Sequence, residues 1–170
     1  MPWYGSHPYL NEYIRTQNCH RILEIGVYTG DNAVSMVETA LENAADPQEV
    51  EYYGFDFFAN QGIERIGRKL EELGCTFQLF EGNTLDTLPR SVPSLPKIDL
   101  IFIDAGKSFR EAVSDWENAE RLMHDGTAVF VHNAGFPGVR RMLAEVSRAK
   151  YEVEILRVPS EGRVALITRK

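Results

Sequence analysis

Two kinds of apolar pattern alternate along the chain. Short apolar runs have the length of buried strands, and between them apolar residues recur every three or four positions, as on one face of a helix. The runs predict strands over 22–25, 50–56, 75–81, 98–104 and 127–133. The periodic stretches predict helices over 8–15, 31–45, 63–73 and 109–123, and a last helix that begins at Pro137. Strands that alternate with helices in this way favour an α/β fold with a parallel sheet.

The C-terminal end of the chain has a different pattern. Two β-rich runs, 151–158 and 163–168, are separated by Pro-Ser-Glu-Gly, which predicts a hairpin. Within the preceding part, the prolines of residues 89–96 indicate a connector, and residues 124–126, His-Asp-Gly, indicate a turn.

The composition of the chain limits the kinds of molecule that the protein can bind as its main partner. The chain has 170 residues, enough for one domain with a sizeable core, and a net charge of −7. That charge argues against a nucleic-acid groove or an anionic membrane surface as the main partner. The sequence shows no signal peptide and no apolar run long enough to span a bilayer. Cys19 and Cys75 lack the spacing of a zinc or redox motif, so we expect a reduced, cytoplasmic protein.

The stretch from Arg21 to Asp31 predicts a nucleotide-binding corner. The apolar run ends at Gly26, a turn follows as far as Gly30, and Asp31 begins the next helix as its N-cap. Glycines at such a corner allow a ligand to approach the backbone, and the helix N-terminus presents free N–H groups. A tight strand–helix corner needs the same glycines, so their spacing by itself does not separate the two roles.

The residues around the glycines indicate which nucleotide the corner favours. A dinucleotide fingerprint, G-x-G-x-x-G, would place glycines where the chain has Tyr28 and Asp31. Asp31 at the helix start would also repel a pyrophosphate. Glu24 precedes the first glycine, and an acidic residue there suits a ligand with a cationic end and no phosphate. S-adenosylmethionine (SAM), a sulfonium nucleoside with an amino-acid tail, has that chemistry.

The segment L-E-I-G-V-Y-T-G, residues 23–30, closely resembles the first motif of the class I SAM-dependent methyltransferases. It resembles in particular the cation-dependent catechol and caffeoyl-CoA O-methyltransferase group and related small-molecule methyltransferases. The resemblance implies a Rossmann-like doubly wound sheet of seven strands, mostly parallel, with an antiparallel C-terminal hairpin strand. It also implies a single domain over residues 1–170 and, by the family default, a homodimer. In the family the N-terminal segment, here 1–18, helps to cover the substrate pocket; a helix packed against the sheet edge is the alternative.

Residues at the predicted strand ends complete the implied cofactor site. The first motif contributes Glu24, Gly26, Tyr28 and Gly30. Asp56 ends the second strand, where an acid can accept hydrogen bonds from ribose hydroxyls, with capping of the next loop as its alternative role. Phe57 follows, and either stacks on adenine or joins the core. In the family, a polar residue at the position of Asn83, usually an Asp, often contacts the adenine amino group. A plain turn is the competing interpretation of Asn83.

The segment D-A-G-K, residues 104–107, follows the most apolar predicted strand and resembles the D-A-D-K motif of the cation-dependent O-methyltransferases. There the Asp binds a divalent metal and the Lys is a proposed general base. If these roles apply to this chain, Asp104 is a metal ligand at the cofactor site, Lys107 is the general base and Asn133 is a second metal ligand. His132 stands where the family has its second Asp, so the site lacks a carboxylate. Such a set holds Mg²⁺ poorly and suits manganese, iron or zinc; alternatively, His132 is the base and no metal is used.

These features give one main hypothesis and two alternatives. The main hypothesis is SAM-dependent O-methylation of a small hydroxylated acceptor. A phenol with a pKa of about 10 costs roughly 4 kcal/mol to ionise at pH 7, and an aliphatic hydroxyl costs roughly 12 kcal/mol, so a weakened metal set favours a phenol or catechol-like acceptor. The altered set also fits a non-catalytic SAM-binding module or subunit. A different Rossmann-type nucleotide enzyme is disfavoured by Tyr28 and Asp31.

Overall fold

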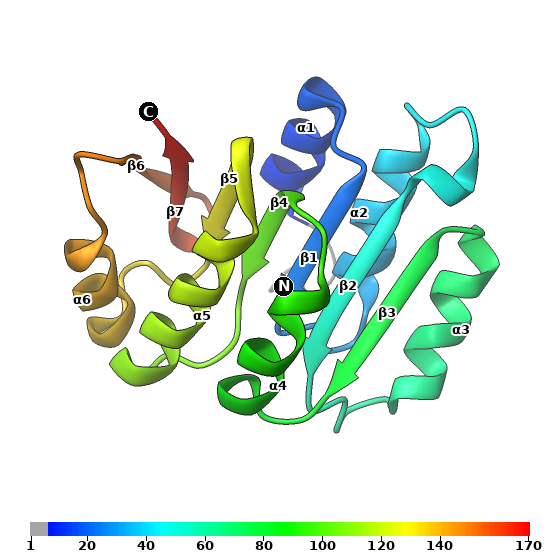
Figure 1. Cartoon of the computed structure of the whole chain (residues 1–170), viewed down its shortest axis with the longest axis horizontal. Coiled ribbons are helices and arrows are strands. Elements are labelled where there is room, and N and C mark those ends of the chain that lie inside the picture. Colours follow the sequence, from blue (N-terminus) through cyan, green and yellow to red (C-terminus); the bar gives the residue numbers. More distant parts are fainter. Residues whose placement is uncertain (1–6) are drawn as a thin grey trace.

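The computed structural model describes residues 7–170. They contain one seven-stranded sheet, in which the strands lie in the order β3-β2-β1-β4-β5-β7-β6 (Figure 1). The strands are β1 Arg21–Ile25, β2 Glu51–Asp56, β3 Thr76–Glu81, β4 Ile98–Ile103, β5 Met123–Val131, β6 Tyr151–Val158 and β7 Gly162–Arg169. The first five are parallel to one another, and β7 is antiparallel to both β5 and β6. The predicted mostly parallel sheet with an antiparallel C-terminal hairpin strand is therefore confirmed.

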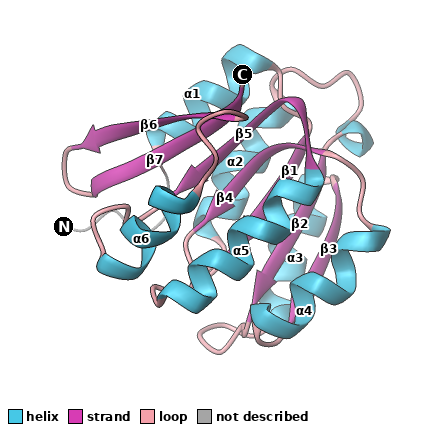
Figure 2. Ribbon diagram, turned by 60° about the vertical axis from the view of Figure 1, so that its left-hand side comes forward, coloured by secondary structure: helices cyan, strands magenta, loops and turns pink. Residues whose placement is uncertain are grey.

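Helices cover both faces of the sheet (Figure 2). They are α1 Pro8–Gln17, α2 Asp31–Leu41, α3 Ile63–Leu73, α4 Thr84–Ser91, α5 Phe109–Leu122 and α6 Pro137–Glu145, with 3-10 turns η1 Pro47–Glu49 and η2 Val92–Ser94. The apolar sides of α1, α2 and α3 share one buried cluster with the sheet, and those of α4, α5 and α6 share a second one on the opposite face. The sheet is thus doubly wound. Within residues 7–170, no helix combines the length and apolar character needed to cross a bilayer.

The central position of β4 explains why its sequence is so apolar. It pairs with β1 on one side and with β5 on the other. Ile101 and Ile103 point into the cluster beneath α5, while Leu100 and Phe102 point into the cluster beneath α2. Because helices cover both faces, a polar residue within this strand would be buried without water, so the polar residues gather at its ends.

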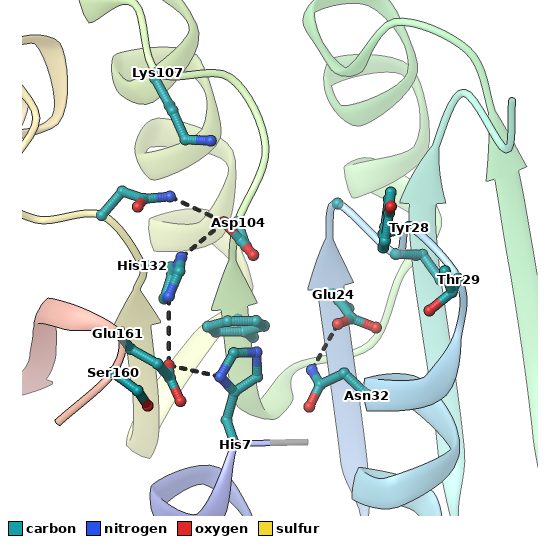
Figure 3. A pocket seen from close by; sticks show the side chains of 14 residues that line it. His7, Glu24, Tyr28, Thr29, Asn32, Asp104, Lys107, His132, Ser160 and Glu161 are labelled. Carbon is teal, nitrogen blue, oxygen red and sulfur yellow. Dashed lines mark hydrogen bonds and ion pairs between the residues drawn. The ribbon is translucent and has the colours of Figure 1, made fainter. Parts of the chain in front are cut away.

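The N-terminal helix packs on the sheet. Leu10 and Ile14 of α1 are fully buried, and Asn11 donates a hydrogen bond to Ser35 of α2. This placement agrees with the alternative of a packed helix for the 1–18 segment, of which residues 1–6 lie outside the described part of the chain. His7, immediately before α1, reaches the carboxyl edge of the sheet (Figure 3).

Two predicted connections were wrong. The connector of residues 89–96 contains the end of a helix, α4, which begins with Asn83 as its N-cap and includes Pro89 near its C-terminus. Residues 124–126 do not form a separate turn, because β5 starts at Met123 and pairs with Ile98 before its register shifts. His124 is held there by Asp99, 2.8 Å from its Nε2 atom, and the strand continues through this irregularity.

Candidate active site

The corner between β1 and α2 packs closely against the end of β4. Gly26 has a φ of +94°, and a Cβ atom on it would lie 2.1 Å from the backbone carbonyl oxygen of Asp104. The carboxyl ends of β1 and β4 can therefore approach each other only if residue 26 is glycine. Gly30, with a φ of +78°, is the N-cap of α2. Asp31 is the first residue of that helix rather than its N-cap, and it accepts hydrogen bonds from Thr29 and Lys69.

Asp56 joins the loops that follow β1 and β2. Its Oδ2 atom accepts hydrogen bonds from the backbone N–H groups of Val27, at 2.7 Å, and Tyr28, at 3.0 Å, and its Oδ1 atom accepts one from Phe58. This is the loop-capping role that we set beside ribose binding. A carboxylate has about four lone-pair sites, so three backbone bonds leave room for one further donor. Phe58 is buried in the core, whereas Phe57 is 62% exposed at the same edge of the sheet.

A cavity of about 440 Å³ opens beside this corner, at the carboxyl ends of β1, β4 and β5. Three groups of side chains line it (Figure 3). One wall consists of Glu24, Gly26, Val27, Tyr28, Thr29 and Asn32; the facing wall consists of Phe102, Asp104, Lys107, His132 and Asn133; and His7, Ser160 and Glu161 close the side. The structure thus brings together Glu24, Gly26 and Tyr28 with Asp104, Lys107, His132 and Asn133, as expected for ends of neighbouring parallel strands.

Glu24 is a buried carboxylate at the wall of this cavity. Its side chain accepts hydrogen bonds from Nδ2 of Asn32, at 2.7 Å, and from the hydroxyl of Tyr52. The residue is only 1% exposed, and this burial raises the pKa of Glu24 to about 8, although the two hydrogen bonds oppose the shift. A bound cation would restore the charged form, because it would supply the favourable electrostatic interaction that water cannot provide here.

Asp104 and His132 form a hydrogen-bonded pair on the facing wall. Oδ1 of Asp104 lies 3.0 Å from Nδ1 of His132 and 3.3 Å from Nδ2 of Asn133. Burial alone would raise the pKa of Asp104, but the hydrogen bond and charge of His132 outweigh it and leave the pKa below its ordinary value. Burial lowers and the contact with Asp104 raises the pKa of His132, and the net shift is upward. An ionised Asp104 therefore fixes the orientation of the imidazole.

Asp104, His132 and Asn133 fit a magnesium site poorly. They offer one carboxylate, and its Oδ1 atom already accepts from the other two side chains. Mg²⁺ demands several oxygen ligands in octahedral geometry. The expected set therefore offers few free oxygen atoms to such an ion, and we assign its hydrogen bonds to the orientation of His132.

The remaining predicted residues are Lys107, which lines the cavity, and Asn83, Asp56 and Phe57, which do not. Lys107 borders the cavity with an exposed side chain, and its Nζ atom is 5.6 Å from the ring centre of Phe136. Asn83 is exposed and caps α4, its Oδ1 atom accepting from the N–H of Leu85 at 3.0 Å. Asn83, Asp56 and Phe57 follow β3 and β2, beyond the cavity along the same sheet edge, so their contacts with a nucleoside stay predictions.

Sequence reasoning missed several residues of the cavity lining, among them His7 and Glu161. His7 Nδ1 lies 2.7 Å from Oε2 of Glu161, and the same oxygen is 3.3 Å from Nε2 of His132 and accepts from the hydroxyl of Tyr9 at 3.0 Å. His7 precedes α1, and Glu161 lies in the turn between β6 and β7. No local motif marks either one; an acidic residue in the predicted Pro-Ser-Glu-Gly turn was the available signal.

Comparisons with known proteins agree with this geometry. The sequence model of the methyltransferase domain family matches residues 23–134, and no curated protein matches the chain. Among solved structures, the O-methyltransferase TomG from Streptomyces achromogenes, in complex with SAM, is 22% identical with a TM-score of 0.77, over 95% of this chain and 78% of TomG. An O-methyltransferase from Bacillus cereus, in complex with SAH, is 18% identical with a TM-score of 0.78, over 99% of this chain and 84% of that one.

A third solved structure shares the same architecture. The SAH-bound methyltransferase PaMTH1 from Podospora anserina is 19% identical with a TM-score of 0.73, over 95% of this chain and 76% of PaMTH1. At these identities the solved structures establish a common fold. The family match extends from β1 to the end of β5 and covers more than half of the chain, so the protein belongs to the methyltransferase domain family.

Proposed function

We propose that the protein is a SAM-dependent O-methyltransferase of small hydroxylated molecules, with phenols or catechols as the favoured acceptor class. The observation that carries the proposal is the cavity of about 440 Å³ in which a buried carboxylate, Glu24, faces the Asp104–His132 pair. Its volume falls in the range typical of small-molecule sites. Family membership and the SAM- or SAH-bound neighbours TomG and the B. cereus enzyme support the choice of cofactor.

The chain offers a fitting set of groups for SAM along the sheet edge. Glu24 would balance the cationic end, while Gly26, Tyr28 and Gly30 form the corner that the nucleoside crosses. Asp56 has one free acceptor site for a ribose hydroxyl, and the exposed ring of Phe57 is available to stack on adenine. The last two proposed contacts are Asn83 with the adenine amino group and Asp104 near the reacting carbon.

When bound, SAM supplies a methyl group that an oxygen nucleophile can attack, and the protein's own task is to position the acceptor and remove its proton. Lys107 is the better-placed base, because it lines the cavity and its side chain is exposed. Nε2 of His132 is buried against Glu161, 3.3 Å away, so His132 serves to hold the wall in place. A phenol with a pKa of about 10 needs only roughly 4 kcal/mol to ionise at pH 7, so modest electrostatic help at the site suffices for it.

A second function is favoured by one observation. The Asp104 site has a single carboxylate and its oxygen is engaged by His132 and Asn133, which also fits a SAM-binding module without catalysis. Incubation with labelled SAM and a panel of phenols, catechols and aliphatic alcohols separates the two functions. Methyl transfer that Lys107→Met abolishes supports the enzyme; SAM binding without transfer to any acceptor supports the module.

The proposal also covers the extent of the domain, its cellular environment and its oligomeric state. We infer one methyltransferase domain over residues 1–170 that takes a small-molecule acceptor. The two cysteines, Cys19 and Cys75, are buried free thiols, which supports a reducing, cytoplasmic environment. A homodimer stays a prediction from the family default.

A further inference from the structure

Three side chains that are distant in the sequence meet at the side of the cavity. His7 stands before α1, His132 follows β5, and Glu161 lies in the turn between β6 and β7 (Figure 3). The atoms that face one another are Nδ1 of His7, Nε2 of His132 and Oε2 of Glu161, all within 4.8 Å of one another. Their side chains are 10%, 16% and 9% exposed, so the meeting point is nearly dry.

The facing atoms are the ones with which these residues bind metals. Two imidazole nitrogens and one carboxylate oxygen are a common three-ligand set for zinc, with a fourth position left open. Bond lengths of about 2.0–2.2 Å around a tetrahedral ion would separate the ligand atoms by roughly 3.3 Å. The structure has 3.3 Å between His132 and Glu161, 2.7 Å between His7 and Glu161, and no more than 4.8 Å between the two imidazole atoms. Side-chain shifts of about 1.5 Å or less would therefore admit an ion.

The neighbours of these residues are arranged as around a metal site. Nδ1 of His132 is held by Asp104 at 3.0 Å, which directs Nε2 toward Glu161. A carboxylate, a backbone carbonyl or a water orients nearly every metal-bound histidine in this way. Tyr9 donates to Oε2 of Glu161 at 3.0 Å and orients that carboxylate in turn. Within the described part of the chain, the buried Nε2 atom of His132 has no partner with hydrogen-bond geometry, as expected for an atom that awaits a ligand.

We propose that His7, His132 and Glu161 bind one divalent transition-metal ion, zinc or an ion of similar preference, with Asp104 as the group that orients His132. This site lies on the opposite side of His132 from the Asp104–Asn133 set that the family resemblance implies. Its nitrogen-rich donor set selects against magnesium. All three residues line the cavity. The use of an open ligand position there to hold an acceptor oxygen rests on the proposed function; the binding of the ion does not.

The test is a calorimetric titration of the intact, chelator-stripped protein with ZnCl₂, CoCl₂ and MgCl₂. We expect one equivalent of Zn²⁺ or Co²⁺ to bind, and Mg²⁺ to bind at least 100-fold more weakly. His7→Gln and Glu161→Gln should each weaken zinc binding at least 100-fold, and Asp104→Asn should weaken it about 10- to 100-fold. His124→Gln is the matched control, because His124 also pairs with an aspartate, Asp99, but outside the cavity. It should bind zinc as the wild type does.

Thermal melting of each variant without metal verifies that the variant is folded. Added zinc should raise the melting temperature of the wild type and of His124→Gln, but not that of His7→Gln. Absence of zinc binding by the folded wild type overturns the site, as does equal binding by the wild type and by Glu161→Gln. Titration with SAM on the same samples separates the two proposals. SAM binding without zinc binding removes the metal site alone, and zinc binding without SAM binding removes the proposed function alone.

Discussion

Nδ1 of His132 lies 3.0 Å from Oδ1 of Asp104, and the two residues follow neighbouring parallel strands, β5 and β4. The backbone N–H of His132 also bonds to the carbonyl of Ile103, so the sheet ladder continues up to the pair and fixes its spacing. A carboxylate and an imidazole are thereby held together at the mouth of the cavity by the sheet itself.

The first prediction concerns the Asp104–His132 pair. Asp104→Asn keeps the size of the side chain but removes the charge, so the pKa of His132 should fall and methyl transfer should drop about 10- to 100-fold. NMR titration of the metal-free protein measures the pKa, and labelled SAM measures turnover. Asp99→Asn, which breaks the other aspartate–histidine pair, should leave both quantities unchanged. Full turnover by Asp104→Asn would show that the pair has no part in the reaction.

The second concerns Glu24 and the charge of the cofactor. Because burial raises the pKa of Glu24 to about 8, the free protein carries a largely neutral carboxyl group at pH 7. A cationic ligand needs the ionised form, so SAM affinity should rise as the pH passes from 7 to 9. Glu24→Gln should bind SAM about 10-fold more weakly at pH 9 and lose this pH dependence. Calorimetry at three pH values tests it, with the exposed Glu38→Gln on α2 as a control; the same pH profile in both variants would exclude the role.

The third concerns Gly26. An added methyl group would meet the carbonyl oxygen of Asp104 at 2.1 Å, in a backbone conformation that other residues rarely adopt. Gly26→Ala should therefore lower the free energy of unfolding by about 3 kcal/mol or more and weaken SAM binding. Gly67→Ala in α3 is the control, since its Cβ would be 3.8 Å from the nearest side-chain atom and should stabilise the helix by about 0.5–1 kcal/mol. Urea denaturation measures both, and equal stabilities would contradict the packing described here.

The fourth concerns Asp115, a fully buried carboxyl group on α5. Burial raises the pKa of Asp115 from 3.8 to about 7. An acid whose pKa is raised in the folded state stabilises that state below its unfolded pKa, and this stability is lost as the pH rises toward the folded pKa. Between pH 4 and pH 8 the loss is on the order of 4 kcal/mol.

Asp115→Asn cannot titrate, so its free energy of unfolding relative to that of the wild type should increase by that amount between pH 4 and pH 8. Urea denaturation at both values measures the difference, in which the contributions of the other titrating groups cancel. Glu117→Gln, at an exposed position on the same helix, should track the wild type. A constant difference between Asp115→Asn and the wild type would show that Asp115 ionises normally.

Local pattern was sufficient for most of the fold. Ile63–Leu73 has a regular apolar spacing and a terminal Gly74, so its helix could be predicted to the residue. The helix predicted over 109–123 likewise agrees with α5, which starts at a capping box formed by Ser108 and Glu111. Pro89 obscured α4, because a proline near the end of a short helix gives the same signal as a connector. The start of β5 could not be predicted, since it depends on pairing with Ile98 across the sheet.

The candidate site likewise contains residues that the sequence could predict and residues that it could not. Glu24, Asp104 and His132 end predicted parallel strands, and topology alone brings such ends to one edge. His7 and Glu161 are 154 positions apart, and they meet only because α1 packs on the sheet beside the β6–β7 turn. The capping role of Asp56 was anticipated as an alternative, but its bonds to Val27 and Tyr28 depend on how two loops pack. Contacts of this kind belong to tertiary structure and leave no local pattern.

The central claim is that the edge formed by β1, β2 and β4 binds a sulfonium nucleoside. Isothermal titration calorimetry of the intact protein with SAM, and with its demethylated product SAH, tests it most directly. We predict saturable one-to-one binding of both ligands, with SAM binding weakened by Glu24→Gln at pH 9. A folded protein that shows no affinity for either ligand would contradict the account.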